Sequence, residues 1–260
     1  MKRILFLADI NSAHTQKWVG SLAERGFVIG IFSLQNPNND WYSEYKNVFI
    51  LNESDISFIK FHESIIKKSI YLKFLPKLKK VIKEFNPDIL HAHYATSYGL
   101  LGRLSNFHPF IISCWGSDIY DFPRKSILYQ FILKHNLLKA DMIFSTSNSM
   151  AKEITKYTDK KIEVTPFGIN LKEFAPKTVQ SIFNKNDIVI GIIKSLEKEY
   201  GIDYLLKSFS LLKKKYASLP LKLLIVGDGS LMNDLKHLAN DINIGSSTFF
   251  AGKIPQKKSN

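Results

Sequence analysis

Short apolar runs alternate with segments of helical periodicity along nearly the whole chain, and this alternation constrains the fold more than any other sequence feature. The expected strands are residues 2–8, 27–33, 47–51, 89–92, 109–114, 142–145, 162–165, 188–193, 221–226 and 248–251. The first expected helix follows the loop at 9–12, carries Trp18, Val19, Leu22 and Ala23 on one face, and ends at Gly26. The other expected helices are residues 58–85, with a break at Pro76, and residues 97–104, 125–138, 148–157, 201–216 and 231–241. Such alternation predicts an α/β fold of parallel sheets with helices on both faces.

The series is interrupted once, which predicts two domains. Residues 166–186 contain Pro166, Gly168 and Pro176 and show no sustained period, so we expect a linker there. We expect Rossmann-like, doubly wound domains at 1–165 and 187–260. The second has only three strands and two helices, so we expect it to be incomplete, with an open strand edge.

Composition limits the cellular compartment in which we expect the protein and the kinds of partner that we expect it to bind. Lys+Arg is 36 against 23 Asp+Glu, a net charge of +13, and only four of the basic residues are arginine. Lysine-rich charge suits an anionic surface or a phosphate better than base-edge readout, and no nucleic-acid-binding motif accompanies it, so nucleic acid is not an expected partner. The single cysteine, Cys114, and an opening unlike a signal peptide predict a reducing, cytoplasmic compartment. No apolar run approaches the roughly 18 residues that span a bilayer.

Two segments of the second half suggest phosphate chemistry. A Gly-Asp-Gly-Ser turn at 227–230 joins a strand to a helix, where backbone N–H groups favour a phosphate, although a tight turn alone also needs glycine. Lys194 and Lys198 follow the preceding strand, where open sheets place ligands; a solvated loop with weakly paired charges is the alternative. The loop at 8–13 has no glycine, so the dinucleotide fingerprint is missing and NAD is not expected.

Polar residues also end two strands of the first half. His91 and His93 bracket Ala92, and we expect them to point to opposite sides and to share no metal-binding face. No zinc-type spacing or nucleophile elbow occurs, so we expect neither a metal site nor a hydrolase. Asp118 follows a small-residue turn, where a carboxylate can cap a helix or bind sugar hydroxyls.

Six short motifs occur in an order that resembles retaining glycosyltransferases of family 4 (glycosyl transferases group 1), which have the two-domain GT-B fold. The motifs are residues 11–15 with Trp18, Leu22 and Gly26, residues 87–93, residues 115–118, residues 164–170 with Phe174, residues 200–206, and residues 226–229. Together they span nearly the whole chain.

This resemblance implies that the two domains bind different substrates. In the family, the second domain binds a nucleotide-diphosphate sugar, the first binds the acceptor, and no metal or other cofactor is required. The substrate-binding residues implied are Lys194, Lys198, Gly227, Gly229, Gly252, His14, Thr15 and His93. Asp118 is the catalytic candidate. Positive charge beside the diphosphate would stabilise the leaving group as the glycosidic bond breaks.

We therefore expect a glycosyltransferase that moves a sugar, with retention of configuration, to a glycan or lipid-linked acceptor in cell-surface polysaccharide or glycolipid synthesis. The paired glutamates of family members would fall after Asn260, so we expect a second domain that is cut short. The alternative is a truncated, catalytically inactive remnant or a binding module. A nucleotide-sugar epimerase with two Rossmann-like domains is a further alternative.

Positive charge is concentrated in one segment of the first domain. Residues 58–83 carry eight lysines and one glutamate among apolar residues, a composition typical of a helix that lies on an anionic bilayer. The predicted membrane contacts are Lys67, Lys68, Lys73 and Lys77. They would place the protein peripherally on the inner face of the cytoplasmic membrane. The alternative is an ordinary helix that packs its apolar side on the sheet.

Overall fold

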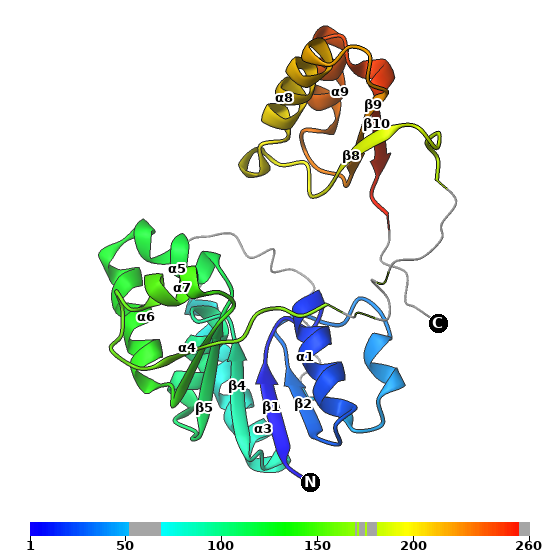
Figure 1. The fold of residues 1–260 in the computed structure, drawn as a ribbon. Coiled ribbons are helices and arrows are strands. Elements are labelled where there is room, and N and C mark those ends of the chain that lie inside the picture. Colours follow the sequence, from blue (N-terminus) through cyan, green and yellow to red (C-terminus); the bar gives the residue numbers. More distant parts are fainter. Residues whose placement is uncertain (52–68, 170, 172–174, 176–180, 255–260) are drawn as a thin grey trace. The chain divides into compact units, whose positions relative to one another are not determined.

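The computed structural model describes residues 1–51, 69–169, 171, 175 and 181–254. The chain divides into two compact units, Met1–Gly168 (unit 1) and Ile169–Asn260 (unit 2), and each has a parallel sheet and a core of its own (Figure 1).

Unit 1 is built on a seven-stranded parallel sheet in the order β3-β2-β1-β4-β5-β6-β7. The strands are β1 (Arg3–Leu7), β2 (Val28–Phe32), β3 (Val48–Ile50), β4 (Ile89–His93), β5 (Phe110–Cys114), β6 (Met142–Ser145) and β7 (Ile162–Val164). The strand order reverses between β1 and β4, so the carboxyl ends of these two strands form a topological switch point, where open α/β sheets bind ligands.

Helices cover both faces of this sheet. The α-helices are α1 (Ala13–Ala23), α3 (Leu75–Phe85), α4 (Ser97–Ser105), α5 (Ser117–Tyr120), α6 (Ile127–Lys139) and α7 (Asn148–Ile154). Short 3-10 turns are η1 (Trp41–Glu44), η2 (Ser69–Phe74) and η3 (Phe122–Lys125). One core joins α3, α4, α6 and α7 to one face through residues such as Leu78, Leu101 and Leu133, whereas α1 packs Val19 against the other.

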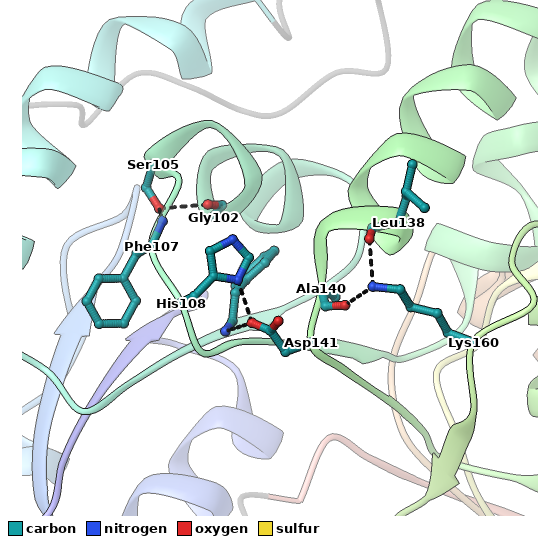
Figure 2. Close-up of polar contacts among 9 residues, drawn as sticks. Gly102, Ser105, Phe107, His108, Leu138, Ala140, Asp141 and Lys160 are labelled. Atoms are coloured by element: carbon teal, nitrogen blue, oxygen red, sulfur yellow. Dashed lines mark hydrogen bonds and ion pairs between the residues drawn. The ribbon is translucent and has the colours of Figure 1, made fainter.

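Polar contacts connect the residues at the amino-terminal ends of β5 and β6 (Figure 2). One carboxylate oxygen of Asp141 accepts a hydrogen bond from the Phe110 N–H at 2.6 Å and lies 2.6 Å from Nδ1 of His108. The Lys160 ammonium donates to the carbonyl of Leu138 at 2.6 Å and to that of Ala140, at the end of α6. These contacts hold the end of the sheet opposite the switch point.

Unit 2 has a three-stranded parallel sheet in the order β10-β9-β8. Its elements are β8 (Ile188–Ile193), η4 (Lys198–Tyr200), α8 (Ile202–Lys215), β9 (Leu221–Val226), α9 (Met232–Asp241), η5 (Gly245–Ser247) and β10 (Thr248–Gly252). A core of Leu206, Phe209, Leu223 and similar residues joins the helices to one face of the sheet. On the opposite face of β8, Ile193 is 81% exposed although its strand is apolar throughout.

Candidate functional site

A pocket of about 490 Å³ lies at the carboxyl ends of β8 and β9 in unit 2. Its lining residues are Ile193, Lys194, Ser195, Val226, Gly227, Asp228, Gly229, Lys253 and Ile254. The structure thus brings three of the predicted substrate-binding residues, Lys194, Gly227 and Gly229, to one pocket. Two ammonium groups and a glycine turn at the end of a parallel sheet suit an anionic ligand that approaches the backbone closely.

The glycine turn between β9 and α9 packs directly on the backbone that follows β8. A Cβ at Gly227, where φ is +141°, would lie 1.9 Å from the Lys194 carbonyl oxygen, and one at Gly229 would lie 2.5 Å from the Leu196 carbonyl oxygen. The N–H of Leu196 donates to the carbonyl of Asp228 at 3.0 Å, which fixes this approach. Both glycines are therefore required for packing, independently of any ligand.

Glu197 binds the residue that leads into α9, Ser230. Its carboxylate accepts hydrogen bonds from the N–H of Ser230 at 3.0 Å and from the Ser230 hydroxyl at 2.5 Å, and these bonds lower the pKa of Glu197. The Ser230 N–H thus has a partner within the protein. A phosphate at this helix terminus would have to displace Glu197 or bind beside it.

The remaining predicted residues of unit 2 differ in position. Lys198 is exposed in η4 and is not among the lining residues, whereas the ammonium of Lys194 lies 4.1 Å from the centre of the Tyr200 ring. Gly252 lies beside the pocket, with φ of +70° and its carbonyl accepting from the Gly227 N–H at 2.8 Å. Sequence reasoning missed Lys253, which the carboxyl end of β10 places at the same edge of the sheet.

In unit 1, histidines gather at the switch point. Thr15, in the first turn of α1, has its hydroxyl 3.3 Å from Nδ1 of His93 at the end of β4. The His14 ring stacks on Phe167 with centroids 3.7 Å apart, and the Trp115 ring lies 4.6 Å from His93. The structure therefore brings together the three predicted residues His14, Thr15 and His93, and adds two aromatic residues that the sequence reasoning did not select.

The imidazoles of this cluster are held in their neutral form. Burial lowers the pKa of His93 well below its usual value, with smaller contributions from His91 and His14, and burial followed by the nearby Lys17 lowers that of His14. Within the part of the chain that the structure describes, the buried Nε2 of His93 and Nδ1 of His14 have no hydrogen-bond partner. A neutral imidazole has one nitrogen that can donate a hydrogen bond to a ligand and one that can accept a hydrogen bond from it.

One expectation about this cluster is wrong. His91 and His93 lie on the same face of β4, with ring centroids 4.9 Å apart, because residues i and i+2 of a strand share a face. His91 Nε2 contacts the Ser113 hydroxyl at 2.8 Å, and burial lowers the pKa of His91 to about 3. Even so, no group of three or more His, Cys, Asp or Glu side chains in the described parts of the chain is arranged to hold a metal ion.

Asp118 is fully buried, and its carboxylate is used by the backbone. It accepts from the N–H groups of Ala95 at 2.8 Å, Trp115 at 3.1 Å and Gly116 at 2.8 Å. Burial raises the pKa of Asp118, and these hydrogen bonds counteract part of that shift. The geometry favours the capping alternative over contact with a substrate, because Asp118 joins the loops that follow β4 and β5 and exposes no atom.

The lysine-rich segment only partly matches the expectation of a lipid-facing helix. Lys67 and Lys68 lie outside the described residues, while Lys73 in η2 and Lys77 in α3 are exposed. The apolar residues Tyr71, Phe74 and Leu75 of this segment pack against the core of unit 1, which agrees with the alternative of an ordinary packed helix. Within the described segments, no helix is long and apolar enough to cross a membrane.

A second pocket, of about 510 Å³, lies between β3 and the end of α3, among side chains that include Arg3, Phe49 and Phe85. It opens among residues at the starts of β1 and β2, so it is remote from the switch point of unit 1. No residue predicted for substrate binding lines it.

The fold and both clusters define an α/β protein of the GT-B type, and comparison with known proteins gives the family. The family model "Glycosyl transferase 4-like" matches residues 3–147 and "Glycosyl transferases group 1" matches residues 175–259. The chain belongs to the glycosyl transferase 4-like family.

Individual relatives are distant. The chain is 26% identical over 204 residues to a glycosyltransferase of Methanocaldococcus jannaschii, covering 70% of this chain and 49% of the relative. It is 23% identical over 256 residues to an alpha-monoglucosyldiacylglycerol synthase of Streptococcus pneumoniae, and the match covers 90% of this chain and 56% of the relative. The chain thus spans about half the length of these two relatives.

Solved structures share the fold. A sucrose-phosphate synthase from Thermosynechococcus elongatus matches with a TM-score of 0.70 and 17% identity, covering 98% of this chain and 71% of that one. A putative UDP-N-acetylglucosamine 2-epimerase from Listeria monocytogenes matches with a TM-score of 0.61 and 14% identity, and the match covers 98% of this chain and 70% of the epimerase chain. At such identities the likeness concerns the fold alone.

Proposed function

We propose that this protein transfers a sugar from a nucleotide-diphosphate donor to an acceptor, with retention of anomeric configuration. The observation that carries the proposal is the pocket of unit 2, where Lys194, Lys253 and a glycine turn meet at the carboxyl edge of the sheet. This pocket lies in the part of the chain that matches the glycosyl transferases group 1 model.

In the proposed reaction, the pocket binds the diphosphate of the donor. Lys194, held against the Tyr200 ring, and Lys253 supply positive charge where the leaving group becomes more negative, which lowers the barrier to breaking the glycosidic bond. Lys198 contributes from outside the lining, and Gly252 shapes the neighbouring turn. Because two lysines provide this charge, we propose that the reaction needs no metal and no further cofactor.

The acceptor binds to unit 1 in this proposal. The half-buried rings of His14 and Trp115 contact the acceptor in this proposal. His93 is buried beside Trp115, and Thr15 fixes the orientation of its ring, so that His93 supports this surface from within. Asp118 acts as a positioning residue, because it holds the loop that carries Trp115. These roles follow from position and hydrogen bonding at the switch point of the sheet.

A glycan or a lipid-linked molecule is the proposed acceptor, in the synthesis of a cell-surface polysaccharide or glycolipid. The similarity to a synthase named for a glucosyldiacylglycerol supports the lipid alternative. Lysines of the segment 58–83 would then hold the protein peripherally on the inner face of the cytoplasmic membrane, through attraction to anionic lipids. The residues proposed for this contact are Lys67, Lys68, Lys73 and Lys77.

Calorimetric titration with UDP, GDP and ADP tests the donor site. We expect one nucleoside diphosphate to bind, and Lys194→Gln to weaken its binding by about tenfold to 150-fold, because a partly desolvated charge-assisted contact is worth about 1.5–3 kcal/mol. Lys236→Gln is the matched control, since Lys236 is an exposed lysine of α9 outside the pocket. No binding of any of the three, or equal loss in both variants, would contradict the proposal.

Measuring turnover distinguishes the proposed transferase from two alternatives, an inactive remnant or binding module and an epimerase. Binding of the nucleotide without transfer to any acceptor favours a truncated, inactive remnant or a binding module. Conversion of a UDP-sugar in the absence of any acceptor favours an epimerase, an activity named for one structural neighbour.

A further inference from the structure

Helix α6 is apolar on its solvent side as well as on its core side. Leu133 and Leu137 are buried against the sheet, yet Ile127 is 85%, Phe131 56% and Leu138 59% exposed. The spacing of four and seven residues places these three exposed side chains in one stripe along the helix. Leu128, 49% exposed, widens the stripe by one position. Large apolar residues gathered on one exposed helix face mark an interaction surface.

The charge around this stripe is predominantly positive. Residues 122–140 contain an arginine and a lysine just before α6 and two lysines within it, and they contain no aspartate or glutamate. The cations are Arg124, Lys125, Lys134 and Lys139. Among the described residues, acidic side chains lie at the edges of this region. Asp121, which is exposed, directly precedes it, and Glu153 of α7 lies 3.7 Å from Arg124. Asp141 is engaged with His108 beyond the end of the helix. An apolar stripe with a cationic border is complementary to a surface that is apolar inside and anionic outside.

From this arrangement we infer that the solvent face of α6, defined by Ile127, Leu128, Phe131 and Leu138, inserts into the headgroup region of an anionic bilayer. Helices of this composition lie in the membrane plane with the apolar side chains below the headgroups. Lys134 and Lys139 have stems long enough to keep their ammonium groups at the phosphates while the neighbouring apolar residues are buried.

A second copy of the chain fits this face less well than a bilayer does. A twofold dimer places the same patch on both sides of the interface, so the cations of one protomer would meet those of the other. Like charges brought together at an interface oppose association, whereas an anionic surface attracts all of them.

This surface is separate from the lysine-rich segment but belongs to the same layer of the fold. Helix α4 packs between α3 and α6, and all three cover the same face of the sheet. On α3 and η2 the apolar residues pack inward, so that region offers lysines without apolar anchors. Helix α6 supplies the anchors. The inference does not depend on the proposed transfer reaction, because membrane binding is measured without donor or acceptor.

Vesicle co-sedimentation of the full chain tests the inference. With vesicles of equal parts phosphatidylglycerol and phosphatidylcholine, we expect the Phe131→Ser/Leu138→Ser double variant to partition about tenfold or more weakly than the wild type, because it removes two apolar anchors. The matched control is Phe49→Ser/Leu211→Ser, which makes the same changes at residues of similar exposure on β3 and α8. Circular dichroism checks that both variants fold.

A single-site probe gives a second readout. Cys114 is buried, and burial raises the pKa of its thiol well above the usual value, so a cysteine added at the surface is the one that an environment-sensitive dye labels. We expect dye on Leu128→Cys to shift to the blue with anionic vesicles, and dye on Leu211→Cys to stay unshifted. Equal partitioning of the two double variants, an unshifted probe at Leu128, or a wild-type dimer that Phe131→Ser/Leu138→Ser converts to monomer without loss of vesicle binding would overturn the inference.

Discussion

Replacing Gly227 by alanine tests how closely the glycine turn of the unit 2 pocket depends on backbone packing. The added Cβ would lie 1.9 Å from the carbonyl oxygen of Lys194, which is backbone and cannot swing away as a flexible side chain can. The N–H of Lys194 also donates to the Val226 carbonyl at 2.9 Å, so a shift that relieves the clash disturbs the pairing of β8 with β9. The change therefore affects both the stability of unit 2 and the shape of the pocket.

The size of the effect follows from two contributions. Forcing a methyl group into a packed site costs about 1–3 kcal/mol, and holding a residue with a Cβ at a strongly positive φ costs about 1–2 kcal/mol more. A total of about 2–5 kcal/mol in a unit of fewer than 100 residues corresponds to a fall in Tm of about 10 °C or more. Gly191→Ala is the matched control on β8, because its Cβ would meet only the Leu224 carbonyl oxygen, at 3.9 Å.

Thermal unfolding followed by two signals separates the units. The three tryptophans, Trp18, Trp41 and Trp115, all lie in unit 1, so tryptophan fluorescence follows that unit, whereas circular dichroism follows both. We expect Gly227→Ala to lower only the transition that fluorescence does not detect, and to abolish nucleotide binding. If Gly227→Ala and Gly191→Ala unfolded at the same temperature, the inferred tight contact between the turn and Lys194 would be refuted.

Three further predictions concern unit 1. Thr15→Val leaves the buried Nδ1 of His93 without its partner, so we expect a loss of about 1–3 kcal/mol in urea unfolding and near-normal stability for Thr15→Ser. Burial raises the pKa of Asp141, but the Phe110 N–H, His108 and Lys160 outweigh it and lower that pKa overall. Asp141→Asn should therefore cost about 1 kcal/mol above pH 5, reduced by solvent screening, and the difference from wild type should vanish as the pH falls through the lowered pKa. Changing the four lysines proposed for membrane contact to glutamine should weaken binding to anionic vesicles at low salt and leave binding at high salt unchanged.

The strands and long helices were predictable because their patterns are local. Each expected strand agrees with an observed strand to within one or two residues, since a strand buried on both faces of a parallel sheet reads as a short apolar run. Gly26, with φ of +84°, ends the first helical segment as expected. The helix expected over 58–85 is described only from Ser69 onward, where η2 precedes α3 at the predicted break near Pro76.

Features that depend on tertiary contacts were not predictable. The short elements α5 and η3 follow from Asp118 holding three backbone N–H groups that come from two different loops, which no local pattern reveals. Likewise, the apolar residues of η2 carry no signal in the sequence that they pack inward while those of α6 remain exposed. The signal that could have revealed the α6 surface is a helix whose apolar residues surround it on all sides.

The position of the unit 2 pocket, which we propose as the donor site, could be predicted from the sequence, but its full set of lining residues could not. Parallel strands end at one edge of their sheet, so residues after β8 and β9 had to lie close together. Lys253 was missed because it follows β10 near the end of the described chain, without a motif of its own. Lys198 was selected by sequence proximity to Lys194, yet η4 turns the chain so that it falls outside the lining.

Hydrogen–deuterium exchange with and without a saturating nucleoside diphosphate tests the central claim that the pocket of unit 2 is the donor site. We expect slower exchange in the peptides that contain Lys194, Gly227–Gly229 and Lys253, because bound ligand and a tightened turn both protect those amides. Exchange around Arg3 and Phe85, at the other pocket, should not change. Protection confined to that second pocket, or no protection anywhere at millimolar nucleotide, would contradict the account.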